Sequence, residues 1–496
     1  MLRKHLKWDI TGNCNLRCKH CLTGDKYREN DRTLSREERG IIVDRLKEGG
    51  VRLVNLLGGE PLLLGDDLLD LARRSTAAGV TLTLNTNGTL LKEGFTRKLI
   101  EAGCRGFTVS LDGPAPEVHD EIRGKGTFQR TVANLMRLKE VNYFGYRVSL
   151  TINTVLTRLN MASVDRMLDL VLTLGAQKWI LLPLVVTGYA ADHEAELSLD
   201  GNEKIVIGEI LAERLRHFSG PFPELEVDLQ FSYPPLRKLV ESQTGLSYRD
   251  SQHCCMAGTT LGFLDPLGNL YGCDRLATAE YADIRINGTE CRPRSLLEHT
   301  FSEIWHHPFY NELFAFVSSD QAYRHYYPCN RCEFLQCGFC IPCPLFGLKY
   351  SKITYDFCLR AERELGPRAL QLEGEIRKGD FRYSGQFPTL GLVSQVGHPG
   401  EIDVHRLTRQ MKKSEWVREN IQWHGAELYD ARQDKFFRLN FLGKEIWCQV
   451  GADRTISQIL EHTGGLLPEG EREAFRQYGL ALMAEMVNNG LVTIIS

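Results

Sequence analysis

Three cysteines near the start of the chain have a spacing that suits an iron–sulfur cluster. They belong to the segment CNLRCKHC, in which Cys14, Cys18 and Cys21 form a C-x3-C-x2-C arrangement. Three thiolates on one loop can hold three irons of a [4Fe–4S] cube and leave the fourth iron open to another ligand. A zinc knuckle is the alternative, but a structural zinc site uses four protein ligands, and no fourth follows at finger spacing. We therefore predict that these three cysteines bind a metal cluster.

A second group of cysteines lies farther along the chain. Ten of the fifteen cysteines fall between Cys254 and Cys358, and only Cys104 and Cys448 stand apart from both groups. Disulfides rarely persist in the cytoplasm, so clustered thiols in a chain of this kind favour soft-metal or iron–sulfur sites. The two isolated cysteines have apolar neighbours, and we expect both to pack as small hydrophobic side chains.

Polar motifs follow several predicted strands. The motif GGEP offers close backbone approach at Gly58 and Gly59 and a carboxylate at Glu60. The segments NTNG, VSLDG and HDEIRG come later, and each of their polar residues also suits a simple cap or turn. These segments and the end of the fifth predicted strand supply further candidates for a binding site. They are Asn85, Thr86, Ser110, Asp112, Arg123 and Asn153.

The elements that must position these motifs alternate between strand and helix. Predicted strands cover residues 8–11, 53–57, 80–85, 106–111, 147–153 and 178–182. An amphipathic stretch over residues 36–48 opens with Ser35 and Glu38 in capping-box spacing. Such alternation predicts parallel β/α units, in which the functional loops lie at the carboxyl ends of the strands.

The segment WDITGNCNLRCKHC and the motifs after it resemble the signature of radical S-adenosylmethionine enzymes. The resemblance implies an α/β fold, a partial (β/α)6 TIM-like barrel, and a [4Fe–4S] cluster whose open iron binds S-adenosylmethionine. One-electron cleavage of this cofactor would give a 5′-deoxyadenosyl radical that takes hydrogen from the substrate. The implied cofactor-binding residues are Gly58, Gly59 and Glu60 at the methionyl ammonium, Asn85, Thr86 and Ser110 near the nucleoside or substrate, Arg123 at the cofactor carboxylate, and Asn153.

The second cysteine group resembles the SPASM extension of radical enzymes, which houses auxiliary iron–sulfur clusters. The segment CMAGTTLGFLDPLGNLYGC fits the first half of that pattern, whereas CNRCEFLQCGFCIPC has one thiol more than the usual second half. The resemblance implies two auxiliary [4Fe–4S] clusters, an outer one on Cys329, Cys332, Cys337 and Cys358 and an inner one on Cys255, Cys273 and Cys340 or Cys343. The extra thiol leaves Cys254, Cys291, Cys340 and Cys343 ambiguous as ligands. A zinc ribbon is the alternative for the paired C-x2-C units.

The end of the chain has a different pattern. Strands are predicted over residues 417–421, 426–430, 435–440 and 491–495, and helices over residues 442–450, 456–464 and 471–490. In the last helix Phe475, Tyr478, Leu482 and Met486 share one face, as core residues do.

This region resembles the peptide recognition element of the pyrroloquinoline-quinone-biosynthesis D-like family, through LNFLGKEIW, RTISQIL and NGLV. The resemblance implies a small winged-helix-like α+β domain that binds the leader of a precursor peptide by strand addition beside residues 435–439. A winged-helix domain for nucleic acid is the alternative. Residues 455–464 contain Glu461 and no Lys or Arg, which disfavours contact with phosphates.

Composition and charge exclude several classes of protein. The 496 residues are 43% hydrophobic and 25% charged, which excludes a mainly disordered or low-complexity chain. The 60 Lys and Arg and 63 Asp and Glu give a net charge of -3, so no general basic field for nucleic acid exists. The first residues lack a secretory signal, and no apolar run reaches the roughly 20 residues of a membrane span. We therefore expect a cytoplasmic protein with neither nucleic acid nor membrane among its partners.

These inferences divide the chain into a radical barrel over residues 1–220, a SPASM domain over 221–365, a connector over 366–414 and a recognition element over 415–496. The predicted function is modification of a ribosomally made precursor peptide, bound through its leader, with a flavodoxin- or ferredoxin-type electron donor. An auxiliary cluster that accepts an electron from the substrate would favour oxidative cross-linking through a C–C, C–O or thioether bond. The alternatives are peptide epimerisation, maturation of a folded protein of the sulfatase or quinoprotein type, and a non-enzymatic, cluster-bearing winged-helix regulator.

Overall fold

The chain forms two compact units. The barrel unit comprises Arg3–Gly245 and Met256–Leu313, and the C-terminal unit comprises Leu246–Cys255 and Phe314–Ser496, with Met1–Leu2. The structure is a computed structural model that describes residues 4–25, 33–140, 148–216, 226–229, 257–258, 260–278, 284–286, 288–290, 294–317, 329–332, 343, 345, 407–422, 425–433, 435–439, 441–465 and 472–495.

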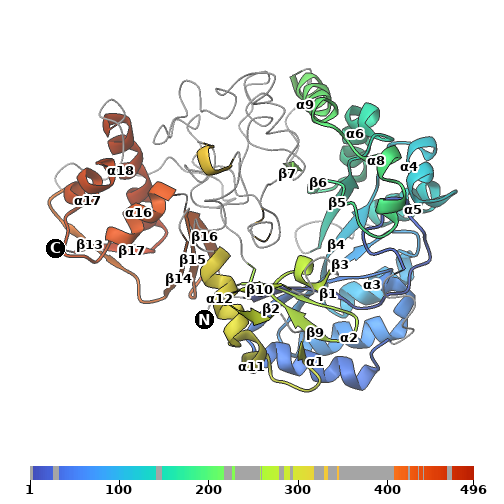
Figure 1. Ribbon diagram of the computed structural model, residues 1–496, viewed down its shortest axis with the longest axis horizontal. Coiled ribbons are helices and arrows are strands. Elements are labelled where there is room, and N and C mark those ends of the chain that lie inside the picture. Colours follow the sequence, from blue (N-terminus) through green and yellow to red (C-terminus); the bar gives the residue numbers. More distant parts are fainter. Residues whose placement is uncertain are drawn as a thin grey trace. The chain divides into compact units, whose positions relative to one another are not determined.

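The barrel unit is built on one ten-stranded sheet with the order β12-β9-β8-β1-β2-β3-β4-β5-β6-β7 (Figure 1). All six predicted strands are present and pair in parallel, with ends shifted by a few residues. The strands are β1 (Lys4–Asp9), β2 (Val51–Leu57), β3 (Thr81–Thr86), β4 (Cys104–Ser110), β5 (Ser149–Val155), β6 (Lys178–Leu182), β7 (Glu226–Leu229), β8 (Leu261–Leu264), β9 (Asn269–Tyr271) and β12 (Arg294–Ser295). A separate hairpin pairs β10 (Arg285–Ile286) with β11 (Thr289–Glu290).

Residues beyond 220 extend this sheet on both sides. Strand β7 pairs in parallel with β6, and β8 pairs in parallel with β1 through the register His5 with Leu261. The predicted boundary at residue 220 is therefore not a boundary between compact units, because the segment that contains β8 completes the sheet of the first one. A motif search cannot reveal this, since strand pairing joins residues more than 200 positions apart.

Helices cover the outer face of this sheet (Figure 1). The described helices up to residue 317 are α1 (Arg36–Glu48), α2 (Asp66–Ala77), α3 (Glu93–Glu101), α4 (Pro116–Arg123), α5 (Thr127–Glu140), α6 (Val164–Leu174), α7 (Tyr189–Asp192), α8 (Glu194–Leu197), α9 (Gly201–Arg216), α11 (Phe301–Trp305) and α12 (Pro308–Val317), with short 3-10 turns η1 (Pro61–Leu64), η2 (Met161–Ser163) and η3 (Asp274–Ala277). The predicted capping box at α1 is confirmed, because Glu38 N donates to Ser35 Oγ and Ser35 N donates to Glu38 Oε2. Residues such as Trp8, Leu84 and Phe107 are fully buried on the helix-covered face.

The described parts of the C-terminal unit contain the elements predicted for the end of the chain. Strands β14 (Val417–Gln422), β15 (Gly425–Asp430) and β16 (Lys435–Leu439) form an antiparallel sheet in that order. Helices α16 (Phe441–Gln449), α17 (Ile456–Gly464) and α18 (Arg472–Asn488) follow, and β17 (Val492–Ile495) pairs with β13 (Gln410–Lys413). The predicted boundary at residue 415 therefore falls too late, because β13 belongs with this group. The connector lies largely outside the described residues.

A hydrophobic core joins these C-terminal elements. It includes Phe437, Trp447 and the expected helix residues Phe475, Leu482 and Met486.

The predictions for the two isolated cysteines have different outcomes. Cys104 is buried in β4 as predicted, but the prediction for Cys448 is wrong, because this residue lies on the exposed side of α16.

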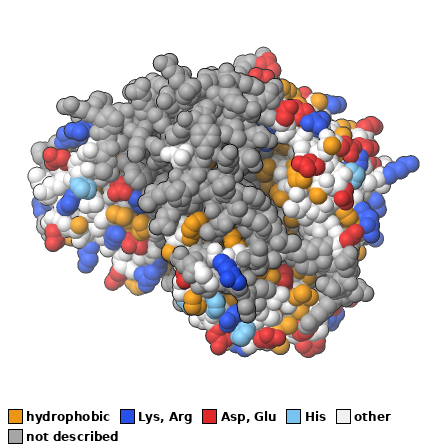
Figure 2. Space-filling view, viewed as in Figure 1, with side chains coloured by type: hydrophobic (Ala, Val, Ile, Leu, Met, Phe, Trp, Pro, Cys, Tyr) orange, Lys and Arg blue, Asp and Glu red, His pale blue; other side chains and the backbone are white. Residues whose placement is uncertain are grey.

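The described surface carries both signs of charge. Figure 2 shows acidic and basic side chains interspersed on the described part of the visible face, in keeping with the nearly balanced composition. Among the described residues, no helix has both the length and the apolar character that crossing a membrane requires.

Candidate functional site

The loop that carries Cys14, Cys18 and Cys21 follows β1 at the carboxyl edge of the sheet. The backbone after β2 holds its first residues. Gly59 N donates to Thr11 O and Glu60 N donates to Asn13 O, each at 2.7 Å. A Cβ at Gly58 would lie 2.4 Å from Thr11 O and one at Gly59 would lie 2.0 Å from Asn13 O, and Gly58 has φ +122°. Both positions therefore need glycine, because the backbone after β2 packs directly against the cysteine loop. The predicted approach of Gly58 and Gly59 to the cofactor stays a prediction.

The carboxylate of Glu60 is buried and hydrogen-bonded inside the chain. Its Oε1 accepts from Leu62 N at 3.1 Å and Thr86 Oγ1 at 2.8 Å, and its Oε2 accepts from Asn87 N at 2.8 Å. Burial raises the pKa of Glu60, although these three donors act in the opposite direction. A carboxylate can accept about four hydrogen bonds, and the described residues supply three of them, so the charge of Glu60 is compatible with one further donor.

Two of the three thiols in the loop receive side-chain donors. Arg123 donates from a terminal nitrogen to Cys18 Sγ at 3.8 Å, and Asn87 Nδ2 lies 4.0 Å from Cys14 Sγ. Burial raises the pKa of Cys18 to about 11, while the guanidinium of Arg123 acts to lower it. Donors to sulfur favour the thiolate form that binds iron, so these residues fit an iron–sulfur cluster.

The described residues contain no group of three or more His, Cys, Asp or Glu side chains placed to hold a metal ion. Ligands of a single metal ion converge on one point. The corners of a cubane are separate irons, so its thiolates do not converge in this way. None of the described cysteines is in a disulfide.

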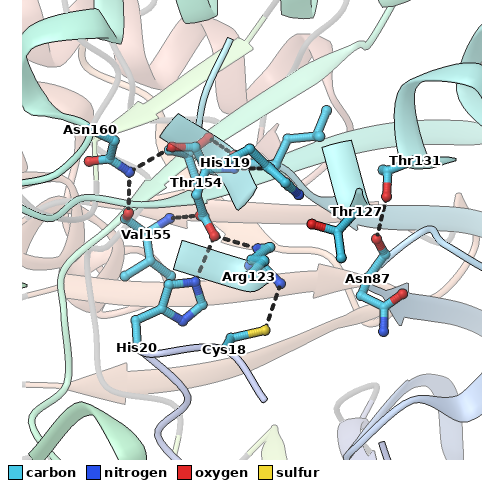
Figure 3. A network of polar contacts seen from close by, with 12 residues as sticks. Cys18, His20, Asn87, His119, Arg123, Thr127, Thr131, Thr154, Val155 and Asn160 are labelled. Carbon is cyan, nitrogen blue, oxygen red and sulfur yellow. Dashed lines mark hydrogen bonds and ion pairs between the residues drawn. The ribbon is translucent and has the colours of Figure 1, made fainter. Parts of the chain in front are cut away.

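A buried ion-pair network lies beside Cys18 (Figure 3). Asp112, two residues after the end of β4, is fully buried, and its Oδ2 lies 2.6 Å from His20 Nε2 and accepts from Arg123 Nε. Its Oδ1 accepts from Val155 N at 2.9 Å. Burial alone would raise the pKa of Asp112, but Arg123 and His20 hold it well below its ordinary value. Arg123 is thus engaged by Asp112 and Cys18, and its predicted pairing with the cofactor carboxylate stays a prediction.

The other predicted cofactor residues lie on two faces of the sheet. Ser110 pairs with Asn153 in the β4–β5 register, and Asn85 lies on the same face of β3. The side-chain oxygens of Asn85 and Asn153 are buried and have no hydrogen-bond partner among the described residues. Such atoms suit a polar ligand, since an unpaired buried acceptor is costly. Thr86 lies on the opposite, helix-covered face, where its hydroxyl supports Glu60.

Four of the predicted auxiliary ligands lie in described parts of the chain. Cys273 is buried directly before η3, where the next residue, Asp274, forms an ion pair with Lys7 of β1. Cys329 is buried in the turn η6 (Cys329–Arg331), and Cys332 N donates to Cys329 O at 3.1 Å. Cys343 is partly exposed. The other auxiliary or ambiguous ligands, Cys254, Cys255, Cys291, Cys337, Cys340 and Cys358, lie outside the described residues.

Two residues of the site were not among the predicted candidates. Asn87 contacts Cys14 and also donates to Asn15 Oδ1 at 2.9 Å, while its backbone NH donates to Glu60. His20 contacts Asp112. Asn87 lies within the motif NTNG and His20 lies within CKHC, so both belong to motifs that the sequence analysis had singled out. Their roles depend on partners far away in the sequence.

Comparison with known proteins gives one family and several relatives. Residues 8–171 match the model of the Radical SAM superfamily. The chain is 34% identical over 193 residues to the AdoMet-dependent heme synthase of Oleidesulfovibrio alaskensis, covering 39% of this chain and 48% of that protein. It is 30% identical over 269 residues to the mycofactocin maturase MftC of Mycobacterium ulcerans, covering 54% of this chain and 67% of that protein.

The structure of anSMEcpe with bound AdoMet has a similar fold. It superposes with a TM-score of 0.50 at 16% identity, covering 74% of this chain and 98% of that one. The chain spans about half of the heme synthase and two thirds of the maturase. With the cysteine loop fixed beside the glycine motif, these matches lead to one conclusion: the chain belongs to the Radical SAM superfamily and is an enzyme.

Proposed function

We propose that this enzyme uses S-adenosylmethionine and a [4Fe–4S] cluster to modify a ribosomally made precursor peptide. When bound, the cluster and cofactor supply a 5′-deoxyadenosyl radical that takes hydrogen from the substrate. Cys14, Cys18 and Cys21 would hold the cluster. Glu60 would accept a hydrogen bond from the methionyl ammonium, and Asn85, Ser110 and Asn153 would bind the polar parts of cofactor or substrate.

The observation that carries the radical chemistry is the way the cysteine loop is fixed. Backbone hydrogen bonds from Gly59 and Glu60 set the position of residues 11–13, just before Cys14. Asn87 and Arg123 then lie against two of the sulfurs. A loop supported in this way can keep three thiolates in place without a metal, so little reorganisation is needed when a cluster binds.

Support for a peptide substrate comes from the C-terminal unit. Strand β16 is the last strand of the order β14-β15-β16, and within the described part of the chain no strand pairs with its other edge. Its residues Phe437 and Leu439 are anchored in the core and keep this edge in place. An extended leader peptide that adds to β16 would gain main-chain hydrogen bonds, and side-chain pockets would select its sequence. Oxidative cross-linking, two auxiliary clusters and a flavodoxin- or ferredoxin-type electron donor complete the proposal.

The test uses anaerobically reconstituted full-length enzyme and synthetic leader peptides from short reading frames beside its gene. Hydrogen exchange should show slower exchange at β16 when the leader binds, with no change at β14, the other edge strand, as the internal control. Binding should change little between 50 and 200 mM salt, whereas nucleic-acid binding would weaken steeply. A leader that protects β14 instead, or neither strand, would contradict the proposed recognition.

A second function is suggested by the relative named AdoMet-dependent heme synthase. The substrate would then be a tetrapyrrole, bound without the C-terminal elements. Removing residues 407–496 distinguishes the two functions, because the deleted part contains no proposed cluster ligand. A peptide-modifying enzyme should keep cofactor cleavage and lose most of its affinity for precursor, whereas a tetrapyrrole enzyme should keep both cleavage and substrate turnover.

A further inference from the structure

Asp112 joins three segments of the barrel unit that are distant in the sequence. His20 comes from the cysteine loop, Arg123 ends α4, and Val155 ends β5. The first two contact Oδ2 of Asp112, and Val155 N donates to its Oδ1. The backbone of Asp112 is also held, because its N–H donates to His119 Nδ1 at 3.1 Å and its carbonyl accepts from Asn160 Nδ2 at 2.9 Å. This many contacts fix the carboxylate in one position.

Arg123 extends this network to the sulfur of Cys18. Its side chain is only 8% exposed, and its guanidinium contacts Asp112 with Nε and Cys18 Sγ with a terminal nitrogen. The cysteine loop is held to α4 by a second contact next to this one, since Lys19 N donates to Ile122 O at 2.9 Å. The guanidinium therefore has a defined orientation toward Cys18 (Figure 3).

The two charges of the network act on Cys18 in opposite directions. The guanidinium of Arg123 favours negative charge on the sulfur, and the carboxylate of Asp112 disfavours it. Both groups are buried, so solvent screens them weakly. A reduced cluster carries one more negative charge than an oxidised one. Hydrogen bonds and charges at the sulfurs therefore change the reduction potential of a cluster.

We propose that Arg123, held by Asp112, is a positioning residue that donates to Cys18 and raises the reduction potential of the cluster on the cysteine loop. The inference rests on the proposed function, because it requires Cys18 to be a cluster ligand. It assigns Arg123 a role that differs from pairing with the cofactor carboxylate. The same role accounts for the buried carboxylate next to Arg123. Asp112 orients the guanidinium and offsets part of its effect on the reduction potential.

The experiment is an anaerobic redox titration of the full chain, followed by electron paramagnetic resonance and performed without S-adenosylmethionine. The signal of this cluster is the one missing from the variant with Cys14, Cys18 and Cys21 replaced by Ala. Arg123→Gln should make reduction about tenfold less favourable, a decrease of about 59 mV for a one-electron couple. Asp112→Asn, which keeps the size of the side chain, should shift the potential upward. The double variant should lie between the two single variants.

Two further variants control for loss of structure. Arg39→Gln removes another buried guanidinium of the barrel unit, whose side chain is 4% exposed and pairs with Asp67, and it should leave the potential unchanged. Arg123→Lys keeps the charge and should stay closer to wild type than Arg123→Gln, which tests the charge if the Gln variant does not fold.

The outcomes separate this inference from the proposed function. Shifts of the same sign in the Arg123→Gln and Asp112→Asn variants, or a wild-type potential in both, would overturn the role of Arg123. A wild-type potential with weakened S-adenosylmethionine binding in Arg123→Gln would place this residue at the cofactor carboxylate instead. Iron content that does not fall in the triple cysteine variant would instead refute the proposed function.

Discussion

Gly59 lies so close to the cysteine loop that any side chain there must displace it. A Cβ at this position would be 2.0 Å from Asn13 O, whereas real Cβ atoms essentially never come within 3.0 Å of such an atom. The two backbones would therefore separate by at least about 1 Å in Gly59→Ala. The hydrogen bonds from Gly59 N to Thr11 O and from Glu60 N to Asn13 O, both 2.7 Å long, span this contact and would be lost or stretched.

The cost of Gly59→Ala follows from these contacts. Two hydrogen bonds at roughly 1 kcal/mol each and overpacking of about 1–3 kcal/mol give a destabilisation of about 3–5 kcal/mol. A displacement of about 1 Å in a group that positions a reaction can lower its rate about 100-fold. We therefore expect Gly59→Ala to fold with less iron and to form 5′-deoxyadenosine about 100-fold more slowly.

The matched control is Gly94→Ala in α3, where a Cβ would have no neighbour within 4 Å. Alanine is also the better helix former, so this variant should keep its iron content, its stability and its rate. Iron content, rate of 5′-deoxyadenosine formation and hydrogen exchange at residues 11–15 would be measured on both variants. A Gly59→Ala enzyme with the iron, rate and exchange of wild type would refute the idea that this close approach sets the position of the loop.

Two other predictions concern pH and metal content. Burial, followed by the charge of Arg123, lowers the pKa of His119 to about 4 in the folded chain. Between about pH 6.5 and pH 4, His119 of the unfolded chain therefore binds a proton that His119 of the folded chain does not bind. The free energy of unfolding, measured with urea, should therefore fall by about 2 kcal/mol from pH 7 to pH 5. It should fall less in His119→Asn, and equal losses in both proteins would contradict this explanation. Reconstituted enzyme should bind about 12 irons if three cubanes form, and Cys329→Ala should keep cofactor cleavage while peptide modification falls. Stoichiometric zinc with about four irons would instead favour the zinc ribbon.

Patterns within short stretches of sequence predicted much of this protein. The spacing of Cys14, Cys18 and Cys21, the glycine motif after β2 and the capping box at Ser35 each lie within a few residues. The strands of the barrel and the C-terminal elements were also found, because side-chain periodicity reports local backbone conformation. Strong local patterns of this kind constrain the backbone before any long-range contact forms.

The direction in which a given side chain faces was harder to predict. Asn85 and Thr86 were both assigned to the cofactor, but neighbouring residues on a strand face opposite sides of the sheet, so only Asn85 shares a face with Ser110 and Asn153. Cys448 has apolar neighbours in the sequence and yet lies on the exposed side of α16. One position along a strand or helix changes the environment of a side chain completely.

The sequence by itself determined the cysteine motif and the succession of strands and helices along the chain. Only the tertiary structure placed β8 beside β1 and gathered His20, Asp112 and Arg123 next to Cys18. The partners of Asp112 and Cys18 are separated from them by as many as 105 positions in the chain. Such contacts depend on how the helices and strands pack and on the register of the sheet, and neither is encoded in any local pattern.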